Sequence, residues 1–187
     1  AFDGGAAGPI GDAFDLIKQF EGFRETPYWD ENAFRVGYGS DTITLSDGTI
    51  KAVTEGMRVS VEDANRDLVR RIAEFQNTVK GQIGETRFNN FNEQQQAILT
   101  SLAYNYGSLP KRILDAVRNG SSADIAAAIR SLQTDGPFLP SGEPVNKSRR
   151  NQEADLFLAT GEVGVEGTIA AEEEKDRKST RLNSSHA

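Results

Sequence analysis

Apolar residues recur at helical spacing near the start of the chain. They run three residues apart through the stretch AFDLIKQFEGF, at Phe14, Ile17, Phe20 and Phe23. This spacing is typical of one face of an amphipathic helix. A proline disfavours helical backbone at the residue before it. We therefore predict a helix that begins near Asp12 and is stopped by Thr26-Pro27.

The next pattern is typical of β-structure. Residues 34–39 and 42–53 are rich in β-branched and aromatic side chains, and Ser46-Asp47-Gly48 separates two short runs. Turn residues between such runs are typical of a hairpin. We predict a small hairpin or meander here and no other β region.

The remaining pattern is helical, with capping residues at its boundaries. The predicted helices run from Ser60 to Val79, Asn92 to Gly107, Pro110 to Gly120, Ser122 to about Leu132 and Asn146 to Thr160. One helix, a β region and then several helices predict an α+β fold. In it a small β-hairpin lobe and a larger helical lobe have a cleft between them.

The chain is long enough for one well-buried domain, which we place at residues 12–160. Residues 1–11 are rich in glycine and alanine and are expected to form a flexible tail or linker. Residues 161–187 have no core-building pattern and are expected to be a disordered tail. Within it, residues 176–187 resemble the translation of a sequencing adapter, and we assign that segment no function.

Composition narrows the chemistry. The chain has no cysteine and one histidine, His186, so thiolate or histidine metal sites and a Ser-His-Asp triad are disfavoured, and we expect no metal or cofactor. The sequence has no apolar run long enough to predict a membrane-spanning segment. The net charge of −7 disfavours nucleic acid as a partner and gives no steering toward an anionic cell wall. We expect a monomer in which carboxylates carry any acid-base chemistry.

Two carboxylates stand out. Glu21 follows Ile17 by four residues, on the apolar stripe and near the C-terminus of the first predicted helix, and both features disfavour a charged carboxylate. Asp30 is predicted to lie in a short, wet loop before the β region, where it stays ionised. A proton donor beside an ionised carboxylate suits glycoside hydrolysis. Such residues also occur in most soluble domains without any catalytic role.

The order of several motifs adds to this. Glu21-Gly22-Phe23-Arg24, Tyr28-x-Asp30 and Val36-Gly37-Tyr38-Gly39 resemble the active-site segment of the phage-type lysozymes, the endolysins of glycoside hydrolase family 24. The stretch 103–107 resembles their helical Asn-x-Gly segment, and Arg149-Arg150-x-x-Glu153-x-x-x-Phe157 resembles their closing helix. The resemblance spans about residues 12–160.

The resemblance implies a muramidase with a lysozyme-like fold. Its substrate would be peptidoglycan, cut at the β-1,4 bond between N-acetylmuramic acid and N-acetylglucosamine, in the periplasm or outside the cell. Glu21 would protonate the leaving glycosidic oxygen. Asp30 would position or activate the attacking water, or stabilise the oxocarbenium-like charge.

Three positions depart from the family pattern. Arg35 stands where a threonine commonly helps to hold the water, on a loop one residue shorter. Arg35 could favour ionised Asp30 or lock it in a structural ion pair. Ser40 replaces a histidine whose role we interpret as structural. The tryptophan that often precedes residues 135–145 is missing, and we expect Trp29 to serve packing rather than sugar stacking.

The candidate substrate-binding residues are Arg35 and Tyr38. Tyr38 could line the cleft, or its two flanking glycines could only permit a close backbone approach. Arg149 and Arg150 are expected to pair with carboxylates of the first lobe. Two alternatives to the hydrolase stay open: a catalytically decayed module that binds peptidoglycan or a partner, and a lytic transglycosylase.

Overall fold

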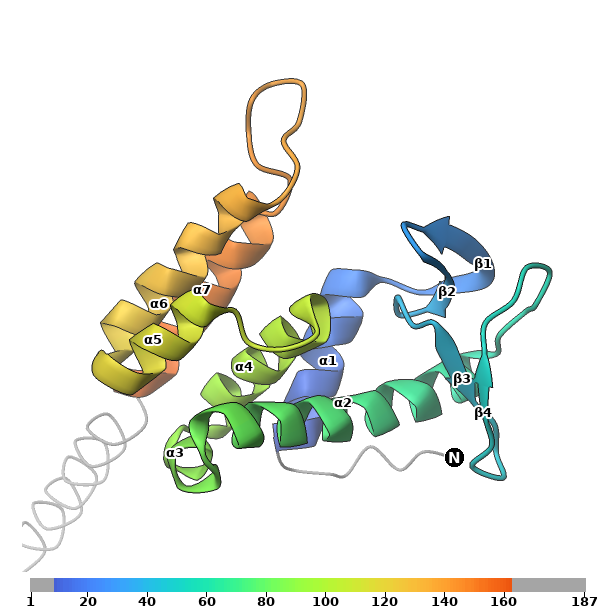
Figure 1. Ribbon diagram of the computed structural model, residues 1–187, viewed down its shortest axis with the longest axis horizontal. Coiled ribbons are helices and arrows are strands. Elements are labelled where there is room, and N and C mark those ends of the chain that lie inside the picture. Colours follow the sequence, from blue (N-terminus) through green and yellow to red (C-terminus); the bar gives the residue numbers. More distant parts are fainter. Residues whose placement is uncertain (1–8, 163–187) are drawn as a thin grey trace, which may run out of the picture. The chain divides into compact units, whose positions relative to one another are not determined.

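The computed structural model describes residues 9–162, in two compact units that meet in sequence between Arg118 and Asn119 (Figure 1). The elements of the first unit are α1 (Pro9–Glu21), β1 (Arg24–Asp30), β2 (Ala33–Gly37), β3 (Thr42–Thr44), β4 (Ile50–Ala52), α2 (Val61–Ile83), α3 (Glu85–Asn90), α4 (Glu93–Tyr106) and α5 (Lys111–Asn119), whose last residue crosses the boundary. The second unit contains α6 (Ser122–Ser131), the 3₁₀ helix η1 (Leu132–Asp135) and α7 (Lys147–Glu162). The predicted α+β class is confirmed.

Helix α1 differs from the prediction at both ends. It begins at Pro9, so part of the segment assigned to the N-terminal tail is helical. It ends at Glu21 because Gly22 adopts a left-handed φ of 65° and donates its N–H to the carbonyl of Lys18 at 3.1 Å. Glycine leaves a helix in this way at little steric cost. Phe23 therefore lies outside the helix and is 39% exposed.

Strand β1 was missed from the sequence. It pairs with β2 in an antiparallel hairpin, and its register shifts between Arg24 and Tyr28. Pro27 occupies this irregular stretch instead of stopping a helix, as proline is tolerated at bulges and strand edges. The predicted loop around Asp30 was wrong, because Asp30 ends a strand and pairs with Ala33. The second hairpin, β3–β4, confirms the prediction for residues 42–53.

Helices α2 and α4 form where their caps predict them. The Ser60 hydroxyl accepts the N–H of Asp63, and Asn92 forms a capping box with Gln95. Helix α4 ends at Gly107, which is left-handed. Helix α2 continues beyond the predicted end to Ile83, and α3 was not predicted.

The core of the first unit lies where α1, α2 and α4 contact one another, and both hairpins lie near the first turns of α2 (Figure 1). Its buried side chains come from α1, the strands, α2 and α4, and they include Ala13, Ile17, Val36, Ile43, Leu68, Ile72 and Ala97. This packing fixes the end of α1 beside the β1–β2 hairpin, which places the candidate site.

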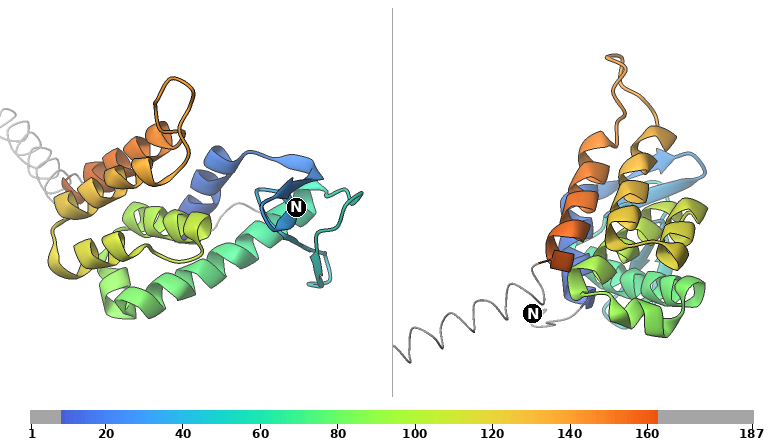
Figure 2. Two further views of the ribbon diagram at one scale, coloured as in Figure 1. Left: turned by 45° about the horizontal axis from the view of Figure 1, so that its top comes forward. Right: turned by 90° about the vertical axis from the view of Figure 1, so that its left-hand side faces the viewer.

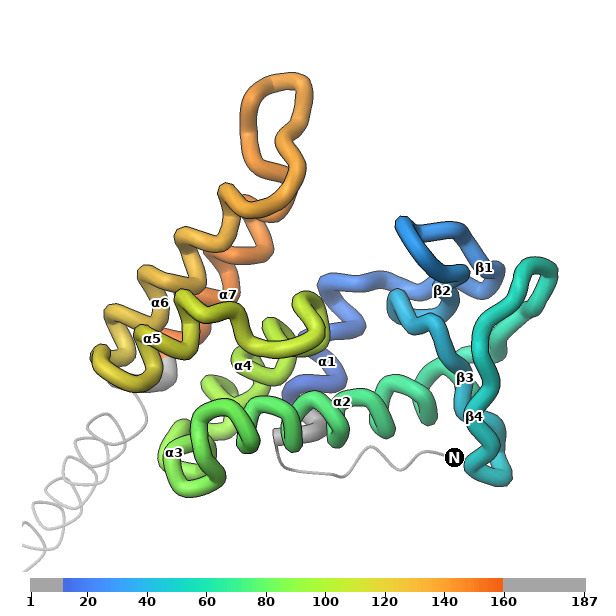
Figure 3. Tube along the Cα trace, in the orientation of Figure 1, coloured from blue at the N-terminus to red at the C-terminus, as the bar shows by residue number. Residues whose placement is uncertain are grey.

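In the second unit, α6 and α7 lie side by side and η1 contacts both (Figure 2). The segment between η1 and α7 projects as a loop that Figure 3 traces clearly, closed by a bridge between Phe138 and Pro144. Arg149 and Arg150 both pair with Glu153 of the same helix, whereas the prediction placed their carboxylate partners in the first lobe. The predictions for residues 1–8 and 163–187 lie outside the described residues.

Candidate active site

The β1–β2 hairpin separates polar from aromatic side chains. Tyr28 lies opposite Arg35, and Trp29 lies opposite Phe34. Because side chains alternate along a strand, Tyr28, Asp30 and Arg35 share one face, and Trp29 and Phe34 share the other. Trp29 packs against Phe34 at 5.1 Å between ring centroids, as the packing interpretation expects, although it is 60% exposed. The polar face is the one that lines the cavity described below.

Arg35 holds Asp30 in place. Its Nε donates to Asp30 Oδ2 at 2.8 Å, and its Nη1 lies 3.4 Å from the carbonyl oxygen of Gly39. The predicted pairing of Arg35 with Asp30 is confirmed. The Asp30 side chain is 50% exposed, so the ion pair leaves part of the carboxylate open to solvent.

Glu21 lies against the turn at residues 37–39. A methyl group built on Gly39 would be 3.3 Å from Glu21 Oε2 and 4.0 Å from the Tyr28 hydroxyl, so both groups lie close to this glycine. A methyl group on Gly37 would be 3.0 Å from Cβ of Ala64 on α2. Both glycines have positive φ. Gly37 permits close approach to α2, and Gly39 makes room beside the candidate acid.

Tyr38 was considered either as a residue that lines the cleft or as a structural residue, and its geometry fits the structural role. Its side chain is buried, and its hydroxyl donates to Asn65 Oδ1 at 2.9 Å. It is not among the residues that line the cavity, so its assignment as a substrate-binding residue gains no support from the geometry. Tyr28 lines the cavity in its place. Burial raises the pKa of the Tyr28 phenol, Arg24 opposes that rise, and the nearby carboxylates of Asp30 and Glu21 add to it.

The end of α4 forms the opposite wall. The buried Tyr104 hydroxyl donates to the carbonyl oxygen of Tyr38 at 2.7 Å, which ties α4 to the turn beside Glu21. Burial raises the pKa of Tyr104 strongly, the Arg71 cation lowers it in part, and the charge of Glu21 adds to the rise. Three residues after Tyr104 also line the cavity: Asn105, Tyr106 and Gly107.

These groups surround an open cavity of about 460 Å³. Glu21, Asp30 and Arg35, three of the four candidate residues, line it together. The sequence analysis missed Arg71 and Phe75 of α2, which also line it. Their spacing of four residues puts them on one helix face, but which face meets the cavity depends on packing. Glu31, at the hairpin turn, completes the acidic lining.

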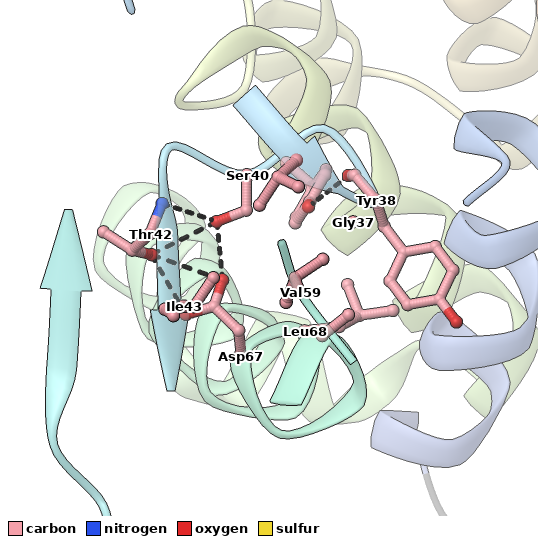
Figure 4. A pocket seen from close by; sticks show the side chains of 11 residues that line it. Gly37, Tyr38, Ser40, Thr42, Ile43, Val59, Asp67 and Leu68 are labelled. Atoms are coloured by element: carbon pink, nitrogen blue, oxygen red, sulfur yellow. Dashed lines mark hydrogen bonds between the residues drawn. The ribbon is translucent and has the colours of Figure 1, made fainter. Parts of the chain in front are cut away.

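A buried carboxylate surrounded by hydroxyl groups lies in the core, beside the cavity. Asp67 is 1% exposed and accepts hydrogen bonds from the hydroxyls of Ser40, Thr42 and Thr44 and from Arg70. Figure 4 shows the hydroxyls of Ser40 and Thr42 converging on this carboxylate. Ser40 therefore has a structural role in this chain, since its hydroxyl bonds the buried Asp67 carboxylate.

Neither a metal site nor a membrane span is evident in the part of the chain that the structure describes. No group of three or more histidine or acidic side chains within residues 9–162 is arranged to hold a metal ion. Within the same residues no helix has the length and apolar character that crossing a bilayer requires.

Comparison with known proteins agrees with this geometry. The family model described as phage lysozyme matches residues 18–153, from the last turn of α1 into α7. The chain belongs to the phage lysozyme family. The family match includes both candidate catalytic carboxylates, Glu21 and Asp30, and the α4 segment that forms the wall of the cavity. No curated protein matches the sequence significantly.

Solved structures place this phage lysozyme chain in the same fold. The endolysin from Escherichia coli O157:H7 phage FAHEc1 is 25% identical and has a TM-score of 0.60, over 79% of this chain and 90% of the endolysin. The muramidase domain of SpmX from Asticaccaulis excentricus is 22% identical with a TM-score of 0.59, over 78% and 94%. A mutant of P22 lysozyme is 21% identical with a TM-score of 0.58, over 79% and 95%. The predicted lysozyme-like fold is confirmed.

Proposed function

We propose that this phage lysozyme family member is an active muramidase. It hydrolyses the β-1,4 bond between N-acetylmuramic acid and N-acetylglucosamine in peptidoglycan. The observation that carries the proposal is that Glu21 and Asp30 line one open cavity in the part of the chain that the family match covers. Paired carboxylates that flank a scissile bond are the machinery of most glycoside hydrolases.

Glu21 acts as the general acid. Its proton passes to the glycosidic oxygen as the bond from that oxygen to C1 breaks, and the bonding electron pair leaves with the oxygen. The sugar ring becomes oxocarbenium-like, and the Asp30 carboxylate stabilises its positive charge. Water then adds to C1 and gives up a proton to Asp30, which acts as the base. Solvent returns both carboxylates to their starting protonation states.

Arg35 supports this role of Asp30. One guanidinium bonds the carboxylate and also approaches the Gly39 carbonyl, and Gly39 lies against Glu21. The guanidinium therefore fixes Asp30 relative to Gly39, the residue that lies beside the candidate acid Glu21. The hydrogen bond is 2.8 Å long and joins two charged groups, so it holds the carboxylate in one orientation. Arg35 is a positioning residue in this mechanism.

One observation favours a second function, a peptidoglycan-binding module without turnover. The ion pair between Arg35 and Asp30 occupies a carboxylate oxygen that the family mechanism uses to handle water. If the pair persists when substrate binds, the cavity binds glycan and does not cut it. The half-exposed Asp30 side chain leaves room for water, and for this reason we favour the hydrolase.

Analysis of the products tests the proposal. Purified peptidoglycan is incubated with the protein, and the released muropeptides are examined by mass spectrometry before and after borohydride reduction. A muramidase gives fragments with reducible N-acetylmuramic acid ends. Anhydro ends would show a lytic transglycosylase instead. Binding without release of fragments would show the binding module and would overturn the proposal.

A further inference from the structure

The cavity contains a second guanidinium that the proposed mechanism does not use. Arg71 lies on α2 and lines the cavity, and 14% of its side chain is exposed. Its Nη1 donates to the Ser40 hydroxyl at 3.0 Å and to Asp41 Oδ1 at 2.9 Å. Asp41 is not among the residues that line the cavity. Arg71 is therefore held by two residues outside the cavity, Ser40 and Asp41, while part of its side chain reaches the cavity.

Aromatic rings fix the orientation of this guanidinium. Its central carbon lies 5.1 Å from the ring centroid of Tyr104 and 5.6 Å from that of Phe75, and both rings also line the cavity. Within residues 9–162 no hydrogen bond uses its Nη2, and its buried Nε has no partner. The Nη2 donors, which folding leaves unused on this firmly held arginine, are suited to a ligand with acceptor oxygens.

The charges around the cavity favour an anionic ligand at Arg71. Among the lining residues, Glu21, Asp30 and Glu31 are acidic, and Arg35 is paired with Asp30. Arg71 is the cavity guanidinium that no lining carboxylate bonds in the described part of the chain. The whole chain carries a net charge of −7, so an acidic substrate gains no attraction from the protein as a whole. A fixed local cation such as Arg71 would supply the attraction for an acidic substrate that the protein as a whole lacks.

We propose that Arg71 binds a carboxylate of the peptidoglycan substrate and selects glycan strands that carry one. This inference rests on the proposed function for the identity of the substrate. Two sources offer the same chemistry: the lactyl carboxyl of N-acetylmuramic acid where no peptide is attached, and the carboxylates of the attached stem peptide. A carboxylate from either source can accept charge-assisted hydrogen bonds from Nη2 of Arg71.

The test measures binding of the full chain to cell-wall sacculi by co-sedimentation. All proteins carry Glu21→Gln, so that the substrate is not consumed. Each is offered untreated sacculi and sacculi whose carboxyls have been converted to methylamides. We expect Arg71→Gln to weaken binding to untreated sacculi about tenfold or more. The same change should make no difference on the methylamidated sacculi, because no carboxylate is left to bind.

Arg70→Gln is the matched control. Arg70 precedes Arg71 on α2, bonds the same hydroxyl and carboxylate cluster, and does not line the cavity. Both variants change the net charge of the protein by the same amount. The two variants are compared on the same kind of sacculi, so the altered charge of the treated walls affects both equally. Arg70→Gln should bind both kinds of sacculi as its parent does. Arg71→Lys, which keeps the charge, supplies the test if Arg71→Gln fails to fold, and it should lose part of the affinity.

A third substrate separates the two sources of carboxylate. An amidase removes the stem peptides and releases soluble glycan strands with free lactyl carboxyls, and binding to these strands is measured after they have been immobilised on beads. Arg71-dependent binding that survives this treatment assigns the ligand to the lactyl group, and its disappearance assigns the ligand to the peptide. Equal loss of binding on untreated and methylamidated sacculi would overturn the inference. Because binding is scored without turnover, a failure of the hydrolase proposal would appear separately in the product analysis.

Discussion

Two aspartates in the first unit are each paired with an arginine, but in unlike surroundings. Asp30 is bound by Arg35, and half of its side chain is exposed at the cavity. Asp67 is 1% exposed, and three hydroxyls and Arg70 donate to its two oxygens. The lone pairs of Asp67 are therefore used in holding the β3 region onto α2. Those of Asp30 are only partly used, which leaves a carboxylate able to act on water.

The comparison separates stability from chemistry. An exposed ion pair contributes from zero to about 1 kcal/mol, because water already solvates both charges well. A buried carboxylate with several donors is different, since its loss leaves buried hydroxyls and part of a guanidinium without their acceptor. Asp67 should matter mainly to folding, and Asp30 mainly to turnover.

Replacing each aspartate by asparagine tests this division and gives the largest expected effect. Asp67→Asn should lower the free energy of unfolding by about 3–5 kcal/mol, because the amide cannot accept all of the hydrogen bonds that three hydroxyls and Arg70 donate to the buried carboxylate. Asp30→Asn should lower it by less than about 1 kcal/mol. Urea unfolding followed by circular dichroism measures both. Similar losses in the two variants would show that the surroundings do not distinguish the carboxylates.

Arg35 sharpens the comparison from the cavity side. Arg35→Thr and Arg35→Ala both remove the guanidinium that fixes Asp30 beside Gly39. A charge-assisted hydrogen bond is worth about 1.5–3 kcal/mol, so turnover at saturating cell wall should fall roughly tenfold or more in both. Retained or faster turnover in Arg35→Thr alone would mean that the family's usual hydroxyl works on this hairpin. Unchanged rates in both variants would remove Arg35 from the site.

Tyr104 gives the smallest effect and a dependence on pH. Tyr104→Phe loses the hydrogen bond to the Tyr38 carbonyl and should cost about 1 kcal/mol at neutral pH. Burial raises the pKa of Tyr104 above its ordinary value of 10.0, so the folded protein keeps a proton that the unfolded chain loses at higher pH. Stability should therefore fall as the pH rises above about 10, and less steeply in Tyr104→Phe. Equal slopes for both proteins would contradict the assignment.

Local chemistry made much of the helical fold predictable. Ser60 and Asn92 cap helices through hydrogen bonds to backbone groups three residues on, and a single sequence contains that information. The first hairpin was harder to predict, because Pro27 looked like the stop of α1. Gly22 already ends that helix, and the chain then continues as β1.

The candidate site was predictable in part. Glu21, Asp30 and Arg35 come from one short stretch of sequence, where motif order narrows the choice. Arg71 and Tyr104 line the same cavity from helices far along the chain. Their sequence neighbourhoods do not reveal which helix faces meet there. Tyr38 could not be separated from Tyr28 as a cavity residue until the turn at residues 37–39 placed its ring in the core.

The assignment of Glu21 as the acid is tested most directly by clearing of permeabilised Gram-negative cells. Glu21→Gln keeps the shape of the side chain but cannot donate the proton, and general acid catalysis is worth about a hundredfold or more in rate. Glu25→Gln is the matched control, because Glu25 is exposed, pairs with Arg58 and does not line the cavity. We predict that wild type and Glu25→Gln clear the cells at similar rates and that Glu21→Gln, folded to the same melting temperature, does not. Clearing by Glu21→Gln at the wild-type rate would contradict the account.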